Sequence, residues 1–425
     1  MRDAFPAILA IVLGVMILQL GNGLVGILVP LRMGLDGLSP SMIGVVATFY
    51  SLGFLVGCFL LPVLVRRIGH IRAFAVLAAL VSAGSLGFTL GVDWLLWGGI
   101  RFVLGICMAG LFSVSESWIV AQAPQAIKGR VLSLYMVCNK LTLAGGQMLV
   151  MVGDPMGIGF FLLISVCASL SLVPVALTKA ATPPIPSISM LSMRELYSIA
   201  PAALVGCVSS GLTNAAVIGI TPLYGLQIGL TAGPIAALVS VMQIGSLAAQ
   251  WPMGWLSDRI DRRIVIVSGL GVVIVMSVVI ALAGAVLPLW ALYLVFAIWG
   301  ATGLSIYAVC IAHASDFAEP AKMVPLTSSL LLAWALGSAV GPLLATYIME
   351  LMGPPGLFVY AAVISTGTAL FVGYRMTRRS PVPVDQREKF VNMPATSPQV
   401  SQMNPRVPPD APGEPPRTPE DASAK

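Results

Sequence analysis

Residues 22–30 read NGLVGILVP, and residues 214–222 read NAAVIGITP. A shift of 192 positions carries the first stretch onto the second and aligns residues 19–71 with residues 211–263 without a gap. Thirteen of these 53 aligned pairs are identical. An internal repeat of this length in an apolar chain is typical of membrane transporters built from two similar helical bundles. The sequence therefore predicts two halves that share one plan.

The composition places most of the chain in lipid. Its mean hydropathy is +0.95 and only 9% of its residues are charged, whereas a soluble protein of 425 residues needs far more polar surface. The six cysteines all lie in apolar runs, without the spacing of a metal site or a disulfide framework. The net charge of +6 comes from loop residues. We therefore expect the lipid bilayer as a partner, and no nucleic acid, cofactor or metal.

Twelve apolar runs approach the length of about 20 residues that a helix needs to cross a bilayer. They lie at residues 5–29, 41–64, 73–91, 94–121, 131–152, 158–178, 199–221, 233–256, 264–286, 289–312, 326–349 and 357–374. The sequence thus predicts an all-α polytopic membrane protein with twelve transmembrane helices in two pseudo-symmetric six-helix bundles. The bundles are expected at residues 1–178 and 199–378, with a cytoplasmic inter-bundle loop at 179–198. Residues 379–425 are rich in Pro and Ser, which predicts a disordered cytoplasmic tail.

Basic residues set the predicted orientation. With twelve spans and the N-terminus inside, the inner loops up to Arg379 hold fifteen Lys and Arg residues, and the outer loops hold only Arg32. Cytoplasmic loops of membrane proteins carry such an excess of positive charge. We therefore expect an integral multi-pass protein of the cell (inner or plasma) membrane with both termini in the cytoplasm.

The strongest local motif follows the eighth predicted span. It reads GWLSDRIDRR over residues 254–263, and its counterpart after the second span reads PVLVRRIGHIR over residues 62–72. With twelve spans in two repeats, these loops resemble the major facilitator superfamily, whose signature there is Gly-x-x-x-Asp-Arg-x-Gly-Arg-Arg. The first copy departs from the signature, with Pro62 for Gly and Arg66 for Asp. Further motifs are most similar to the YcaD-like branch of that superfamily, among them those at residues 101–105, 116–118, 250–252 and 337–342.

The resemblance implies a role for these loops. In the superfamily they form ion pairs that latch the inner gate. The residues implied here are Arg67, Asp258, Arg259 and Arg263 of these loops, with Arg130 from the loop after the fourth span. The residues themselves also allow a simpler interpretation, in which the cations only fix the orientation, because an exposed ion pair contributes little stability. Both interpretations stay open at the level of the sequence.

Three charged residues, Arg101, Glu116 and Lys140, lie inside predicted spans. A charge near the bilayer centre costs roughly 2.5–3.5 kcal/mol or more, so such residues tend to face the bundle interior and a partner. Glu116 and Lys140 lie at similar depth on consecutive helices and could form an ion pair. Glu116 could instead pair with the gate arginines, or it could bind a proton or contact the substrate. Lys140 could face a central cavity or extend to the headgroups.

The resemblance adds to the candidate cavity. Many superfamily members carry an arginine at the place of Arg101, linked to proton coupling or to anionic substrates; the alternative is contact with outer headgroups. Asn22 and Asn214 are repeat mates in the first and seventh spans, which line the central cavity in the superfamily. The predicted cavity and coupling residues are Asn22, Arg101, Glu116, Lys140 and Asn214. Other polar residues at middle depth are expected to make only helix–helix hydrogen bonds, among them Gln19, Tyr50, Asn139, Gln147, Gln243, Tyr307 and Trp334.

The expected function is secondary active transport of a small solute by alternating access. The chain lacks a P-loop pattern and the HExxH, GxSG and GxGD motifs of intramembrane enzymes, so we predict no catalytic residue and no enzyme. Arg101 and Lys140 with little acid favour an anionic or neutral polar solute. Coupling to protons is left open, since Glu116 is the only acid inside a predicted span. The alternative function is a transporter-like membrane sensor or scaffold without solute flux.

Overall fold

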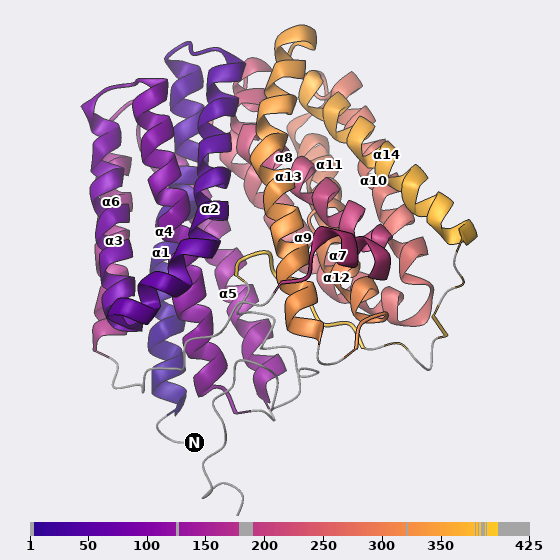
Figure 1. Cartoon of the computed structure of the whole chain (residues 1–425). Coiled ribbons are helices and arrows are strands. Elements are labelled where there is room, and N and C mark those ends of the chain that lie inside the picture. Colours follow the sequence, from indigo (N-terminus) through magenta and orange to yellow (C-terminus); the bar gives the residue numbers. More distant parts are fainter. Residues whose placement is uncertain are drawn as a thin grey trace, which may run out of the picture.

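The fold is built from helices (Figure 1). The computed structural model describes residues 4–124, 127–177, 190–319, 322–378, 380, 382–383, 387 and 389–397, and no strand occurs within these ranges. One half holds α1 (Ala4–Leu35), α2 (Pro40–Ile68), α3 (His70–Gly87), α4 (Trp94–Gln122), α5 (Lys128–Met148) and α6 (Gly159–Ala176). The other half holds α7 (Met193–Ile199), α8 (Pro201–Gln227), α9 (Ala232–Arg259), α10 (Arg262–Ala283), α11 (Leu289–Gly303), α12 (Ile306–Ser315), α13 (Met323–Met352) and α14 (Gly356–Arg378).

Twelve membrane-length segments occur in the described ranges. Eleven are both long enough and apolar enough to cross a bilayer, and one of them, residues Leu289–Ser315, combines α11 and α12 across a short break. The twelfth is α5, whose 21 residues span about 30 Å at 1.5 Å per residue. Its hydropathy is lower because it carries polar residues such as Asn139 and Lys140. The predicted all-α polytopic fold is confirmed.

The two halves use the same kind of close helix–helix contact, made at a glycine. Gly53 of α2 lies against the backbone oxygen of Phe102 in α4, and its repeat mate Gly245 of α9 lies against that of Ala297 in α11. A Cβ atom at either glycine would overlap that oxygen, and small residues let membrane helices approach this closely. Equivalent helix pairs therefore meet at equivalent positions, which is the three-dimensional counterpart of the sequence repeat.

The bundle has two ends, which we name by their loops. The basic end carries the α2–α3 and α9–α10 loops, and the far end lies opposite. At the far end the halves touch directly: the backbone N–H of Ser41 donates to Glu350 Oε1 over 3.1 Å, and Gly34 of α1 packs against Leu226 of α8. Direct contact between the halves therefore closes the far end.

Two predicted segments lie partly outside the described residues. Residues 178–189, most of the predicted inter-bundle loop, are not described, and α7 begins shortly after them. Residues 398–425 of the predicted disordered tail are also not described. Residues 389–397, which belong to the predicted tail, lie against the bundle and make the contacts described below.

Candidate functional site

A central cavity of about 380 Å³ lies between the two halves. Its walls come from α1, α2, α4 and α5 of the first half, from α8, α9, α12 and α13 of the second half, and from residues 392–396. Of the five predicted cavity residues, four lie on its wall, namely Asn22, Arg101, Lys140 and Asn214. Among the described residues that line the cavity, none is Asp or Glu.

Arg101 of α4 brings a buried cation to this wall. Its side chain is buried, and its guanidinium lies 5.0 Å from the ring centroid of Tyr50, a cation–π distance. Its Nε atom has no hydrogen-bond partner within the described part of the chain. A buried polar group normally finds a partner, so this N–H is an exception on a residue that lines the cavity.

Lys140 joins the two halves across the cavity. Its Nζ donates to Ser246 Oγ of α9 over 2.7 Å. The hydroxyl of Ser240 donates in the same region to the backbone oxygen of Ala144 over 3.2 Å. The lysine therefore faces the cavity rather than the headgroups, and a neutral hydroxyl leaves its charge free to attract an anion.

Amide side chains complete the polar wall unequally in the two halves. In the first half, Gln19 donates to Asn139, and Asn22 donates to Gln19 Oε1 over 3.0 Å. In the second half, Asn214 is buried, and its Oδ1 has no hydrogen-bond partner among the described residues. The repeat mates Asn22 and Asn214 thus differ: the first belongs to a network, and the second offers a free acceptor.

The polar residues expected to make only helix–helix contacts also reach the cavity. The wall includes Gln19, Tyr50, Asn139, Gln147, Gln243, Tyr307 and Trp334. Their residue types gave no sign of this, because an amide or a tyrosine looks the same whether it faces a helix or a cavity. Their middle depth in the spans was the one signal available.

Glu116 of α4 lies apart from these residues. It is fully buried and does not line the cavity. Its Oε1 accepts from Tyr135 Oη over 3.0 Å and from Thr396 Oγ1 over 2.5 Å, and its Oε2 accepts from Ser397 Oγ. Neither the pair with Lys140 nor a pair with the gate arginines occurs within the described part of the chain. The partners of this carboxylate are therefore hydroxyls, two of them from the C-terminal segment.

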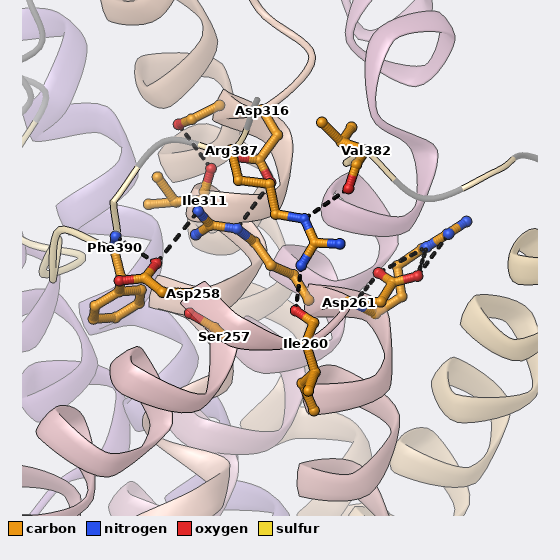
Figure 2. A network of polar contacts seen from close by, with 12 residues as sticks. Ser257, Asp258, Ile260, Asp261, Ile311, Asp316, Val382, Arg387 and Phe390 are labelled. Atoms are coloured by element: carbon orange, nitrogen blue, oxygen red, sulfur yellow. Dashed lines mark hydrogen bonds and ion pairs between the residues drawn. The ribbon is translucent and has the colours of Figure 1, made fainter. Parts of the chain in front are cut away.

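The ion pairs at the basic end belong to the second half (Figure 2). Arg262 Nε lies 2.8 Å from Asp316 Oδ2, and both side chains are buried. Arg262 also lies 3.6 Å from Asp258, the acid of the loop motif. This pair connects the start of α10 to the end of α12. Sequence reasoning missed Asp316, because nothing in the chain links position 316 to the motif.

Asp261 and Arg263 form a second pair in the α9–α10 loop, with Oδ2 and Nη2 separated by 2.7 Å. Burial opposes ionisation of Asp261, but hydrogen bonds from Arg263 outweigh it and lower the pKa of the carboxyl below its usual value. The carboxylate therefore stays charged at neutral pH and accepts from the backbone N–H of Arg263 at the start of α10.

The other predicted gate residues divide into two kinds. The guanidinium of Arg259 lies 3.7 Å from the ring centroid of Trp255. Arg67 and Arg130 are exposed, and no ion pair of theirs occurs among the residues that the structure describes. The structure thus brings Asp258, Asp261, Arg262 and Arg263 together in one half, and it does not join Arg67 or Arg130 to them.

Comparisons with known proteins agree with this architecture. The sequence model of the Major Facilitator Superfamily matches residues 11–237 and 202–407 of the chain. YcaD of Escherichia coli O6:K15:H31 (strain 536 / UPEC), named an uncharacterized MFS-type transporter, is 27% identical over 354 residues, which cover 83% of this chain and 91% of YcaD. YcaD of Escherichia coli strain K12 / DH10B is equally similar.

Solved structures share the fold at low sequence identity. The nucleoside transporter NupG superposes with a TM-score of 0.72 at 11% identity, covering 86% of this chain and 99% of NupG. A bacterial homologue of the human lysosomal transporter Spinster, solved in an inward-facing and occupied conformation, gives 0.67 at 14% identity, covering 91% and 99%. The Escherichia coli fucose:proton symporter FucP gives 0.53 at 14% identity, covering 88% and 99%.

Proposed function

The chain belongs to the Major Facilitator Superfamily and is a membrane transport protein, and on that premise we propose that it moves a small solute as a secondary active transporter. Alternating access is the proposed mechanism, because two similar bundles enclose a cavity at their interface and contact each other directly at the far end. Membership of this family favours a transporter over an enzyme. In this conformation the cavity would serve as the solute site.

The proposed solute is anionic or neutral and polar. The observation that carries this proposal is the pair of cations, Arg101 and Lys140, on a wall whose described residues include no acid. Arg101 brings N–H donors and Asn214 brings an amide to the same wall, and Arg101 Nε and Asn214 Oδ1 have no hydrogen-bond partner among the described residues. A lipophilic cation would meet like charge and no counter-charge in this cavity.

We also propose that the basic end faces the cytoplasm, with both termini on that side of an inner membrane. The α2–α3 and α9–α10 loops at this end carry the Arg residues that favour the cytoplasmic face. A cysteine in place of exposed Ser380, just after α14, is expected to react with an impermeant thiol reagent in inverted vesicles. Reaction only in right-side-out vesicles would contradict this orientation.

Binding is the first test of the solute class. Small carboxylates, neutral sugars and cationic dyes are added to the purified protein, and its thermal unfolding is followed. We expect a carboxylate or a sugar to raise the unfolding temperature, and Arg101→Gln with Lys140→Gln to abolish that shift. Arg378→Gln is the matched control, because Arg378 is exposed and contacts Tyr374 at the end of α14. Selective stabilisation by cationic dyes would contradict the proposed class.

Flux is the second test, and it separates transport from the sensor or scaffold alternative. Right-side-out and inverted vesicles are loaded with the stabilising solute, and its exchange is measured in both directions. We expect exchange in at least one preparation and its loss in the Arg101→Gln variant. Absence of exchange in both preparations, with the protein folded and binding the solute, would favour the scaffold.

Proton coupling through Glu116 is a finer part of the proposal. The carboxylate is buried in α4 beside the cavity helices, and Tyr135 of α5 contacts it, so its protonation would change contacts between two walls. The fold neighbour FucP is a fucose:proton symporter. We expect a proton gradient to drive uptake in the wild type, and Glu116→Gln to keep solute exchange but lose that dependence. Wild-type uptake that does not depend on the proton gradient would contradict the coupling.

A further inference from the structure

Described residues after α14 lie against the basic end of the bundle and reach the cavity there. We name residue 387 and residues 389–397 the tail segment. Residues 392–396 line the same cavity as Arg101 and Lys140, and Met393 and Ser397 are only 3% and 2% exposed. Ordering a short segment of chain costs conformational entropy, so specific contacts must hold it there.

One anchor of the tail segment lies in the second half (Figure 2). The backbone N–H of Phe390 donates to Asp258 Oδ1 over 2.8 Å. Arg387 Nη1 donates to the backbone oxygen of Ile260 over 2.5 Å. The ring of Phe390 occupies the space beside Gly254, where a Cβ atom would overlap it. The first glycine and the acid of the loop motif therefore form a socket for the tail.

The other anchor lies in the first half. Thr396 Oγ1 donates to Glu116 Oε1 over 2.5 Å, and Ser397 Oγ donates to Oε2 of the same carboxylate. A buried carboxylate needs such donors, and only Tyr135 would remain among its described partners without the tail. The contact thus stabilises the carboxylate as well as the tail.

The two anchors place the tail segment as a bridge. Asp258 belongs to α9 and Glu116 to α4, so a single stretch of chain connects opposite halves at the basic end. At the far end the halves meet directly, through Ser41 and Glu350. The residues between the anchors take up the cavity wall where a solute approaching from the basic end would pass.

We propose that the tail segment is a tethered plug, an autoinhibitory ligand that the protein carries for its own cavity. It holds the halves in the conformation with the far end closed, and it competes with a solute for the basic-end mouth. The inhibitory part rests on the proposed transport function, whereas the seating of the plug does not. Glu116 is then a socket for the plug rather than a contact of the solute.

The first experiment measures whether the plug is seated, without any solute. Met393→Cys is exposed to a water-soluble maleimide in inverted vesicles, and peptide-level mass spectrometry reads residue 393 separately from the six native cysteines. Ser380→Cys, exposed just after α14, is the accessible reference. We expect residue 393 to react at least about tenfold more slowly than residue 380, because it reacts only when the plug leaves its site. Equal rates would overturn the proposal.

The anchors are then loosened one at a time. Thr396→Val with Ser397→Ala removes both hydroxyls from Glu116, and Phe390→Ala empties the pocket at Gly254. Each is expected to speed the reaction of residue 393 about tenfold, the Thr396 and Ser397 variant through lost hydrogen bonds and Phe390→Ala through lost apolar packing. The swapped variant Thr396→Ser with Ser397→Thr keeps both hydroxyls, so residue 393 should react with the maleimide at an unchanged rate. Slow labelling in both loosened variants would contradict the plug.

Exchange of the stabilising solute supplies the inhibitory readout. We expect the loosened variants to exchange it about tenfold faster than the wild type, because release of the plug opens the basic-end mouth. Faster labelling with unchanged exchange would overturn autoinhibition. If labelling follows the proposal but no variant exchanges any solute, the plug stands and the proposed transport function fails.

Discussion

The two halves of the molecule share a backbone plan and differ in the chemistry of the basic end. In the second half, Arg262 at the start of α10 pairs with buried Asp316, and Asp261 caps the helix. The repeat mate of Arg262 is His70, which starts α3 and packs against Trp118, with ring centroids 5.8 Å apart. One loop is thus fixed by charge and its counterpart by an aromatic contact.

This difference shows which features a repeated fold must keep. The glycines that fasten α2 to α4 and α9 to α11 occur in both halves, because helix axes can approach closely only where no side chain intervenes. Among the described residues, the ion pairs of these loops occur in the second half. The first half can do without them, because a helix end can be stabilised by an aromatic contact as well as by ion pairs. The tail segment contacts one acid in each half, Asp258 of the motif in the second half and Glu116 of α4 in the first.

The largest expected effect separates the repeat mates Arg262 and His70. Arg262→Met leaves Asp316 buried without this partner, which costs about 3–5 kcal/mol. His70→Phe keeps a ring against Trp118 and removes a polar atom, Nδ1, that has no partner among the described residues, so the change is expected below about 1 kcal/mol. Denaturant unfolding in detergent measures both variants. Similar losses would show that the two loops are held alike.

The next effect tests the shared plan. Gly53→Ala and Gly245→Ala each bring a Cβ against a backbone oxygen, and each is expected to cost about 1–3 kcal/mol, because backbone atoms cannot move aside as a side chain does. Gly271→Ala in α10 is the control, since nothing lies within 4 Å of its added Cβ. The unfolding assay reads all three. A large loss in one half alone would break the symmetry of helix packing.

A smaller effect distinguishes the repeated asparagines of the cavity. Asn214→Ala removes a cavity-wall amide whose Oδ1 has no partner among the described residues, so solute exchange is expected to weaken about tenfold with little change in stability. Asn22→Ala removes a hydrogen bond to Gln19, so stability is expected to fall by about 1 kcal/mol. Solute-dependent exchange and thermal unfolding are measured together on both variants. Equal behaviour of the two would argue that the cavity is functionally symmetric.

The smallest effect concerns Arg67 and Arg259, which occupy equivalent positions in the two loop motifs. Arg259→Gln loses the contact with the Trp255 ring, worth about 0.5–1 kcal/mol at an exposed site. Arg67→Gln, its repeat mate, removes an exposed charge without an ion pair among the described residues and is expected to change stability by less than about 0.5 kcal/mol. Unfolding of the two variants side by side checks the difference, and a larger loss for Arg67 would reverse it.

Residue types and spacing alone determined much of this protein. The repeat predicted two halves, the apolar runs predicted the membrane helices, and the cost of charge in lipid singled out Arg101 and Lys140, which line the cavity. Asn22 and Asn214 were found because they occupy equal positions in the repeat. These features are local or periodic, so they can be read along a single chain.

The tertiary structure decided the partners. Composition predicted disorder after residue 379, because a polar, proline-rich stretch cannot build a core of its own. Residues 396 and 397 nevertheless reach Glu116, about 280 positions earlier in the chain. Arg262 meets Asp316 in the same way, from a different helix. Periodicity shows which face of a helix a residue occupies. Only the packing of distant segments decides which side chain it contacts there, because those partners come from other parts of the chain.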